Sequence, residues 1–62
     1  MDSQMTQMRL NKIIADAGIT SRRGADELII DGRVSVDGFI CRELGAKFDP
    51  DIVIVQVDGE TI

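Results

Sequence analysis

Apolar residues recur with the spacing of an α-helix in two segments of the first half of the chain. In the first segment they stand at positions i, i+3, i+4 and i+7, and they are Leu10, Ile13, Ile14 and Ala17. This stripe predicts an amphipathic helix over residues 8–17. Gly18 follows it, and glycine readily takes the left-handed conformation that ends many helices.

The same spacing returns a few residues later, and its members are Ala25, Leu28, Ile29 and Gly32. The pattern predicts a second helix from about Arg22 to Asp31, with Gly32 as its stop. Thr20 or Ser21 is the expected N-cap, because a hydroxyl there accepts a hydrogen bond from a free N–H of the first turn. The short gap between the two segments requires the helices to pack against each other.

After the second helix, the apolar residues follow the two-residue period of a β-strand. The segment V-S-V-D-G-F-I places Asp37 and Gly38 between short apolar runs, which predicts a hairpin with positive φ at both turn residues. The β-branched run Ile52–Val57 predicts the next strand, and a second pair, Asp58 and Gly59, leads into a short strand E-T-I. Two packed helices followed by a small antiparallel sheet indicate an α+β fold.

The composition of the 62 residues fits one small domain over residues 8–62, preceded by a polar lead-in over residues 1–7 that we expect to be disordered. The single cysteine, Cys41, forms no internal disulfide and indicates a cytoplasmic location. Without histidine, a Cys/His zinc site and histidine-based acid–base catalysis are excluded. No apolar run reaches the ~20 residues of a membrane span. We therefore expect no metal, no cofactor and no membrane association.

The net charge of −4 hides an uneven distribution of charged residues. From Arg9 to Arg33 there are five cations and four anions, whereas from Glu43 onward there are five anions and one cation, Lys47. Exposed charges are screened beyond about 8 Å in physiological salt. A local cationic surface is therefore compatible with an acidic total.

Arg22 and Arg23 stand at the expected start of the second helix, where the helix dipole disfavours cations by about 0.3–1 kcal/mol. Pairs with Asp26 and Glu27, four residues on, return about 0.2–0.5 kcal/mol each, so local stability does not account for the two arginines. Free N–H groups, the Ser21 hydroxyl and two guanidinium groups together favour capture of an anion, be it RNA phosphate, sulfate or an acidic protein. A protein-interaction module that pairs through an exposed edge at Ile52–Val57 is the rival hypothesis.

Several motifs, taken in order, resemble a known family. They are R-L-N-K at Arg9–Lys12, A-G-I-T-S-R-R at Ala17–Arg23, A-D-E-L-I at Ala25–Ile29 and G-R-V-S-V-D-G at Gly32–Gly38. This combination resembles the S-four domain, the RNA-binding domain first described in the fourth protein of the small ribosomal subunit, and the resemblance extends over Met8–Ile62. It is similar in particular to the N-terminal domain of bacterial ribosomal RNA pseudouridine synthases, which are isomerases. The resemblance implies two helices on a small, strongly curved antiparallel sheet, the alpha-L RNA-binding motif.

The resemblance also implies a set of RNA-binding residues, to which our charge analysis adds Lys47. The full set is Arg9, Asn11, Lys12, Ser21, Arg22, Arg23, Asp26, Arg33, Val36, Gly38 and Lys47. Three positions depart from the family pattern: Asp37 replaces a common asparagine, Phe39 stands where a lysine is frequent, and Gly24 stands where a longer polar residue is common. In the synthases the nucleophilic aspartate belongs to a separate domain, so we assign no catalytic residue. We expect a monomeric RNA-recognition domain of such an enzyme, acting on ribosomal RNA, or else a free-standing S-four module.

Overall fold

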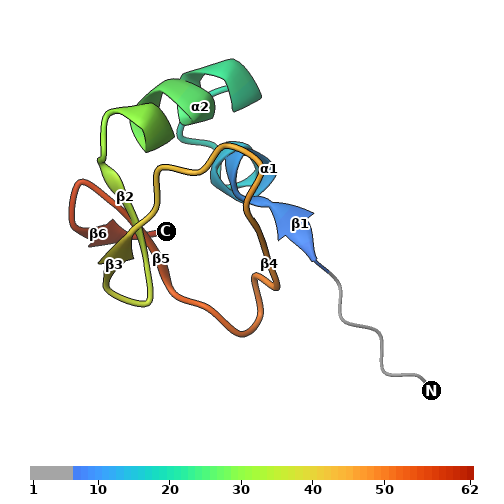
Figure 1. Cartoon of the computed structure of the whole chain (residues 1–62). Helices are drawn as coiled ribbons and strands as arrows, with labels where there is room; N and C mark the ends of the chain where they lie inside the picture. The colour runs from blue at the N-terminus through green and yellow to red at the C-terminus, as the bar shows by residue number, and fades with distance from the viewer. Residues whose placement is uncertain (1–6) are drawn as a thin grey trace.

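The computed structural model describes residues 7–62, so the disorder expected for the lead-in falls almost wholly outside the described residues and stays a prediction. Two helices and six short strands follow one another along the chain (Figure 1). The helices are α1 (Leu10–Asp16) and α2 (Arg22–Ile30). The strands are β1 (Met8–Arg9), β2 (Val34–Val36), β3 (Phe39–Ile40), β4 (Lys47–Phe48), β5 (Val55–Val57) and β6 (Glu60–Thr61). This arrangement confirms the α+β class.

One aliphatic core joins the helices to the sheet. Its buried residues come from one face of each helix and from alternate positions of β2 and β5, and they are Leu10, Ile13, Ile14, Ala25, Ile29, Val34, Val36, Val55 and Val57. The helical spacing read from the sequence supplies the first five, and the two-residue period supplies the rest. The helices pack against each other beside the sheet, as the short loop between them requires (Figure 1).

Helix α2 begins and ends where the sequence indicates. The Ser21 hydroxyl accepts a hydrogen bond from the Gly24 N–H at 3.1 Å, so Ser21 is the N-cap. At the other end Gly32 has φ +76°, its N–H donates to the Ile29 carbonyl, and the Arg33 N–H donates to the Leu28 carbonyl. These bonds form a Schellman motif, which satisfies the last carbonyls of the helix.

The main sheet has four antiparallel strands in the order β3-β2-β5-β6. Both hairpin turns have positive φ at each central residue, with +52° and +88° at Asp37 and Gly38, and +54° and +83° at Asp58 and Gly59. The positive φ values predicted for Asp37 and Gly38 are therefore confirmed, and Asp58 and Gly59 form a second turn of the same kind. Neither helix among residues 7–62 has the length and hydropathy needed to cross a membrane.

Three expectations from the sequence are wrong. The first helix starts at Leu10 rather than at residue 8, because Met8 and Arg9 pair with Phe48 and Lys47 as the strands β1 and β4. The strand expected over residues 52–57 is shorter, because the turn after Asp49 takes up its first residues. That strand, β5, also lies between β2 and β6, so Val55–Val57 offers no free edge for the pairing that the protein-interaction hypothesis proposed.

Candidate nucleic-acid interface

Two arginines occupy the first turn of α2. Arg22 and Arg23 are both exposed, and the turn contains no acidic residue. The Ser21 cap satisfies the Gly24 N–H, while the N–H groups at the very start of the helix have no partner within it. The chain thus presents two guanidinium groups and a helix N-terminus at one place, a combination suited to a phosphate.

The alternative in which these arginines pair with Asp26 and Glu27 is not found among residues 7–62. Among residues 7–62, the salt bridges join Lys12 to Asp16 at 2.7 Å and Arg33 to Asp58 at 2.6 Å. Neither Arg22 nor Arg23 therefore lies within ion-pair distance of a carboxylate in that part of the chain. The alternative of a charged face neutralised by its own side chains does not describe this end of the helix.

Asp26 lies one turn further along α2 and is half-buried. Its Oδ1 atom is buried and has no hydrogen-bond partner. Burial of an acceptor without a donor costs free energy, so internal contacts do not account for this side chain. The resemblance places Asp26 among the RNA-binding residues, but protein atoms cover its Oδ1 atom, so this oxygen is not open to a ligand.

Arg9 and Lys47 stand directly opposite each other in the β1–β4 pair, and both are exposed. Arg9 is also the N-cap residue of α1, although its side chain makes no capping hydrogen bond. Like charges opposite each other in a strand pair are destabilising. An anion bound between them would remove that cost. The sequence carries no sign of this pairing, since two-residue strands show no period and only its charge marks Lys47 as a candidate.

The remaining α1 candidates are less available. Lys12 donates a hydrogen bond to Asp16 one turn away, so part of its charge is compensated within the helix. Asn11 is half-buried. Each of these two residues has less free surface than Arg9 or the α2 arginines.

Arg33 is held by Asp58. The guanidinium donates from Nε to Oδ1 at 2.8 Å and from Nη2 to Oδ2 at 2.6 Å. The hydrogen bond from Arg33 lowers the pKa of Asp58 below its ordinary value and outweighs the opposing effect of desolvation, while attraction to the guanidinium lowers it further. The same pair raises the pKa of Arg33. The charge of Arg33 is thus balanced by the carboxylate of Asp58.

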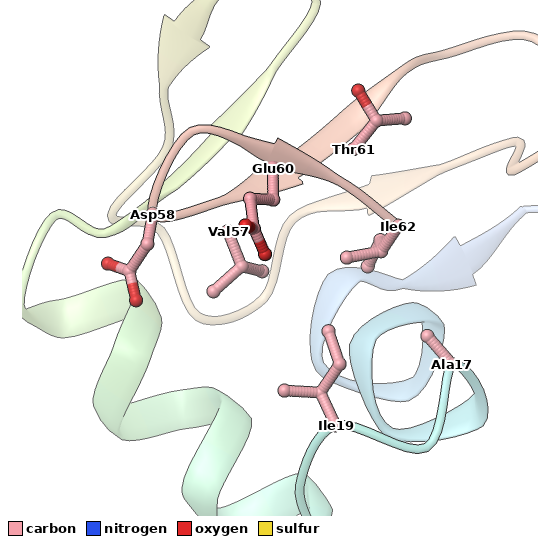
Figure 2. A pocket seen from close by; sticks show the side chains of 7 residues that line it. All are labelled: Ala17, Ile19, Val57, Asp58, Glu60, Thr61 and Ile62. Carbon is pink, nitrogen blue, oxygen red and sulfur yellow. The ribbon is translucent and has the colours of Figure 1, made fainter.

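The surroundings of Asp58 are acidic and apolar. An open groove of about 380 Å³ runs beside it, and Figure 2 shows its lining. Glu60 adds a second carboxylate, while Ile19 and Ile62 extend toward Val57 from two sides. The carboxylates of this groove would repel a phosphate, so the groove is not a continuation of the cationic surface.

The last two candidates lie in the first hairpin. Val36 is buried in the core, with 7% of its surface exposed, so its side chain is not a contact surface. Gly38 is exposed in the turn with φ +88°, a conformation that glycine adopts without strain. Both residues shape the hairpin, and their approach to a ligand is limited to the backbone.

Together these features define a small α+β module with exposed cations on one helix start and one strand pair. The family model of the S4 domain, which is the S-four domain that the motifs resemble, matches residues 8–53. The chain therefore belongs to the S4 domain family, which confirms the resemblance drawn from its motifs.

Several curated proteins share this domain. An uncharacterized RNA pseudouridine synthase of Mycobacterium leprae is 56% identical over 59 residues, covering 95% of this chain and 23% of that protein. One of Aquifex aeolicus is 47% identical over 58 residues, covering 94% of this chain and 23% of that protein. The ribosomal large subunit pseudouridine synthase B of Bacillus subtilis is 56% identical over 39 residues, covering 63% of this chain and 16% of that protein. The chain thus spans less than a quarter of the length of these relatives.

Proposed function

We propose that this S4 domain is the RNA-recognition part of a ribosomal RNA pseudouridine synthase and that it docks structured RNA through four cations. These four, here called the cationic set, are Arg9, Arg22, Arg23 and Lys47. The observation that carries the proposal is the start of α2. Two exposed arginines follow the Ser21 cap there, and neither has a carboxylate partner among residues 7–62. The names of the relatives support the class of enzyme.

The cationic set acts on the RNA backbone. Phosphate contacts fix the position and orientation of a protein without reading sequence. Double-stranded RNA is recognised mainly through its shape, its phosphates and its 2′-hydroxyls, since its major groove is too narrow for side chains. The domain would thus position the enzyme on its RNA, and the chemistry at the uridine would belong to residues outside this chain.

The magnitude of binding follows from the number of phosphate contacts. Four contacts predict that log affinity falls against log salt with a slope of about −3 to −4. The isolated domain would bind with a Kd on the order of 10⁻⁴ to 10⁻⁶ M, as is typical of binding dominated by phosphates. Tethering to a catalytic domain that holds the same RNA would raise the overall affinity through effective concentration.

The test compares single charge removals. Arg22→Gln and Arg23→Gln each remove one cation and keep good helix formers in α2. Thr61→Glu, on β6 and outside the cationic set, changes the net charge by the same amount and is the control. Binding of a ribosomal RNA hairpin is measured at several salt concentrations.

Each arginine variant should weaken binding and reduce the magnitude of the salt slope by about 1. The control should keep the wild-type slope. The proposal fails if wild-type binding is indifferent to salt, or if Thr61→Glu weakens binding as much as the arginine variants do.

A further inference from the structure

The two aromatic residues of the chain, Phe39 and Phe48, line the same open cleft. The cleft has a volume of about 480 Å³ and lies between the first hairpin and the segment that leads to β5. Phe39 is 78% exposed, the most exposed large apolar side chain among the described residues. Phe48 is half-buried at the edge of the core. An aromatic face is thus open to solvent inside a concave site.

The backbone explains why this ring stays uncovered. Phe39 pairs with Val36, so its side chain projects on the same side of the sheet as the core. However, β3 is an edge strand of the sheet, and the core residues that the sheet contributes lie on β2, next to β3, and on β5 beyond it. Hydrogen bonds to β2 hold the Phe39 backbone in place. The backbone therefore presents the ring beyond the edge of the core, where core side chains do not cover it.

The charged groups of the cleft exclude a phosphate. Asp37 and Glu43 contribute two carboxylates. One oxygen of Asp37 accepts the Ile54 N–H at 2.8 Å, which leaves its other oxygen as an acceptor. Arg42 also lines the cleft, but its guanidinium extends over Gly32, where an added Cβ would lie 2.9 Å from Cζ. An aromatic floor with acceptors at its rim suits a flat, neutral ligand that bears N–H donors.

We propose that this cleft holds one unpaired nucleobase of the RNA, stacked on Phe39 with an amino group donated to Asp37 or Glu43. The inference rests on the proposed function and names the part of the RNA that the cationic set does not contact. Bases stack on aromatic side chains irrespective of sequence, and carboxylates accept hydrogen bonds from exocyclic amino groups. Phosphates would lie on the cationic set, and one extruded base would enter the acidic cleft next to the Asp37–Gly38 turn.

The test uses two RNA hairpins with the 62-residue chain. One carries a single bulged 2-aminopurine, which is fluorescent, and the other is fully paired. Phe39→Leu keeps an apolar side chain without the π-face, and Phe39→Trp keeps the π-face. Ile54→Ala removes a comparable exposed apolar side chain that does not line the cleft.

Wild type, Phe39→Trp and Ile54→Ala should bind the bulged hairpin more tightly than the paired one and change the 2-aminopurine fluorescence. Phe39→Leu should lose about 5- to 150-fold in affinity for the bulged hairpin only, which corresponds to the binding free energy of one stacked base. If Phe39→Leu binds like wild type while Arg22→Gln still weakens binding, the inference is wrong and the proposed function stands. If wild type binds neither hairpin, the proposed function itself fails.

A protein segment bearing arginine is the rival occupant, because guanidinium groups also stack on aromatic rings next to carboxylates. An arginine-rich peptide is therefore titrated against wild type and Phe39→Leu. Binding of the peptide that requires Phe39, together with unchanged 2-aminopurine fluorescence, would overturn the assignment of a nucleobase to the cleft.

Discussion

Arg33 and Asp58, 25 residues apart, are joined by three hydrogen bonds. Two connect the guanidinium to the carboxylate, at 2.8 and 2.6 Å, and the third runs from the Asp58 N–H to the Arg33 carbonyl at 2.9 Å. Arg33 directly follows the stop of α2, and Asp58 begins the turn between β5 and β6. The pair therefore fixes the second hairpin against the end of the helix.

The stability contributed by this pair should depend on pH. The folded-state pKa of Asp58 is lowered, so the contribution is present above the unfolded pKa, about 3.9, and is lost as the pH falls through the lower folded pKa. Asp58→Asn removes the charge and keeps a residue that tolerates the positive φ of the turn. Urea unfolding should show wild type more stable than Asp58→Asn at pH 7, with the gap closing below about pH 4.

High salt at pH 7 serves as the control for this prediction. Both side chains are exposed, so salt should narrow the same gap by screening. A gap that stays constant from pH 7 to pH 2.5 would show that the difference comes from the turn and not from the ion pair.

Ser21 allows stability and RNA affinity to be separated at one position. Ser21→Ala removes the cap of α2 and should cost about 1 kcal/mol of unfolding free energy, while the slope of RNA affinity against salt stays unchanged. Ser21→Asp keeps a side chain that caps as well as serine, so stability should stay close to that of wild type. It also places an anion beside Arg22 and should weaken RNA binding. Chemical denaturation and hairpin titration of both variants give the comparison.

RNA binding that is not weakened by Ser21→Asp would count against a phosphate at the start of α2. If Ser21→Asp bound RNA as tightly as wild type at low salt, the anion would lie elsewhere. Ser21→Ala then remains a check of the cap alone, since it changes no charge.

The side chain of Thr20 occupies the space beside Gly24 in α2. A Cβ at this position would lie 3.2 Å from the Thr20 Cβ and 3.4 Å from its Cγ2, with the hydroxyl closer still. Gly24→Ala should therefore fail to deliver the gain of about 1 kcal/mol that alanine brings to a helix. In a Thr20→Ala background, most of that gain should return. A double-mutant cycle measured by urea unfolding reports the coupling, and additive effects would show that Thr20 turns aside freely.

The features that the sequence predicts are those fixed by neighbouring residues. Gly32, Ser21 and the two Asp-Gly turns act through local backbone conformation, so their roles follow from a few adjacent letters. The start of α2 could be located for the same reason, and with it the exposure of Arg22 and Arg23. The helical and strand periods likewise identify the core, because each period assigns one face to burial.

The features that the sequence does not predict depend on pairs far apart in the chain. The β1–β4 pair joins residues 8–9 to residues 47–48 through strands too short to show a period. The strand order places β5 in the middle of the sheet, and no local signal distinguishes a central strand from an edge. Compensation of Arg33 by Asp58 and juxtaposition of Arg9 with Lys47 are consequences of that topology. The candidate site was therefore predicted as a set of residue types, and the structure decides which charges are available.

The pairing of Arg9 with Lys47 predicts a conflict between stability and binding. Lys47→Glu replaces two like charges by an attractive cross-strand pair and should raise the unfolding free energy by about 0.2–1 kcal/mol at low salt. The same change removes one cation of the cationic set, so RNA affinity should fall and the salt slope should lose about one unit. Urea unfolding and hairpin titration, each at two salt concentrations, measure both effects. If Lys47→Glu raised the unfolding free energy but left RNA binding intact, the β1–β4 pair would lie outside the RNA interface. RNA binding would then not account for the two like charges that face each other in this pair.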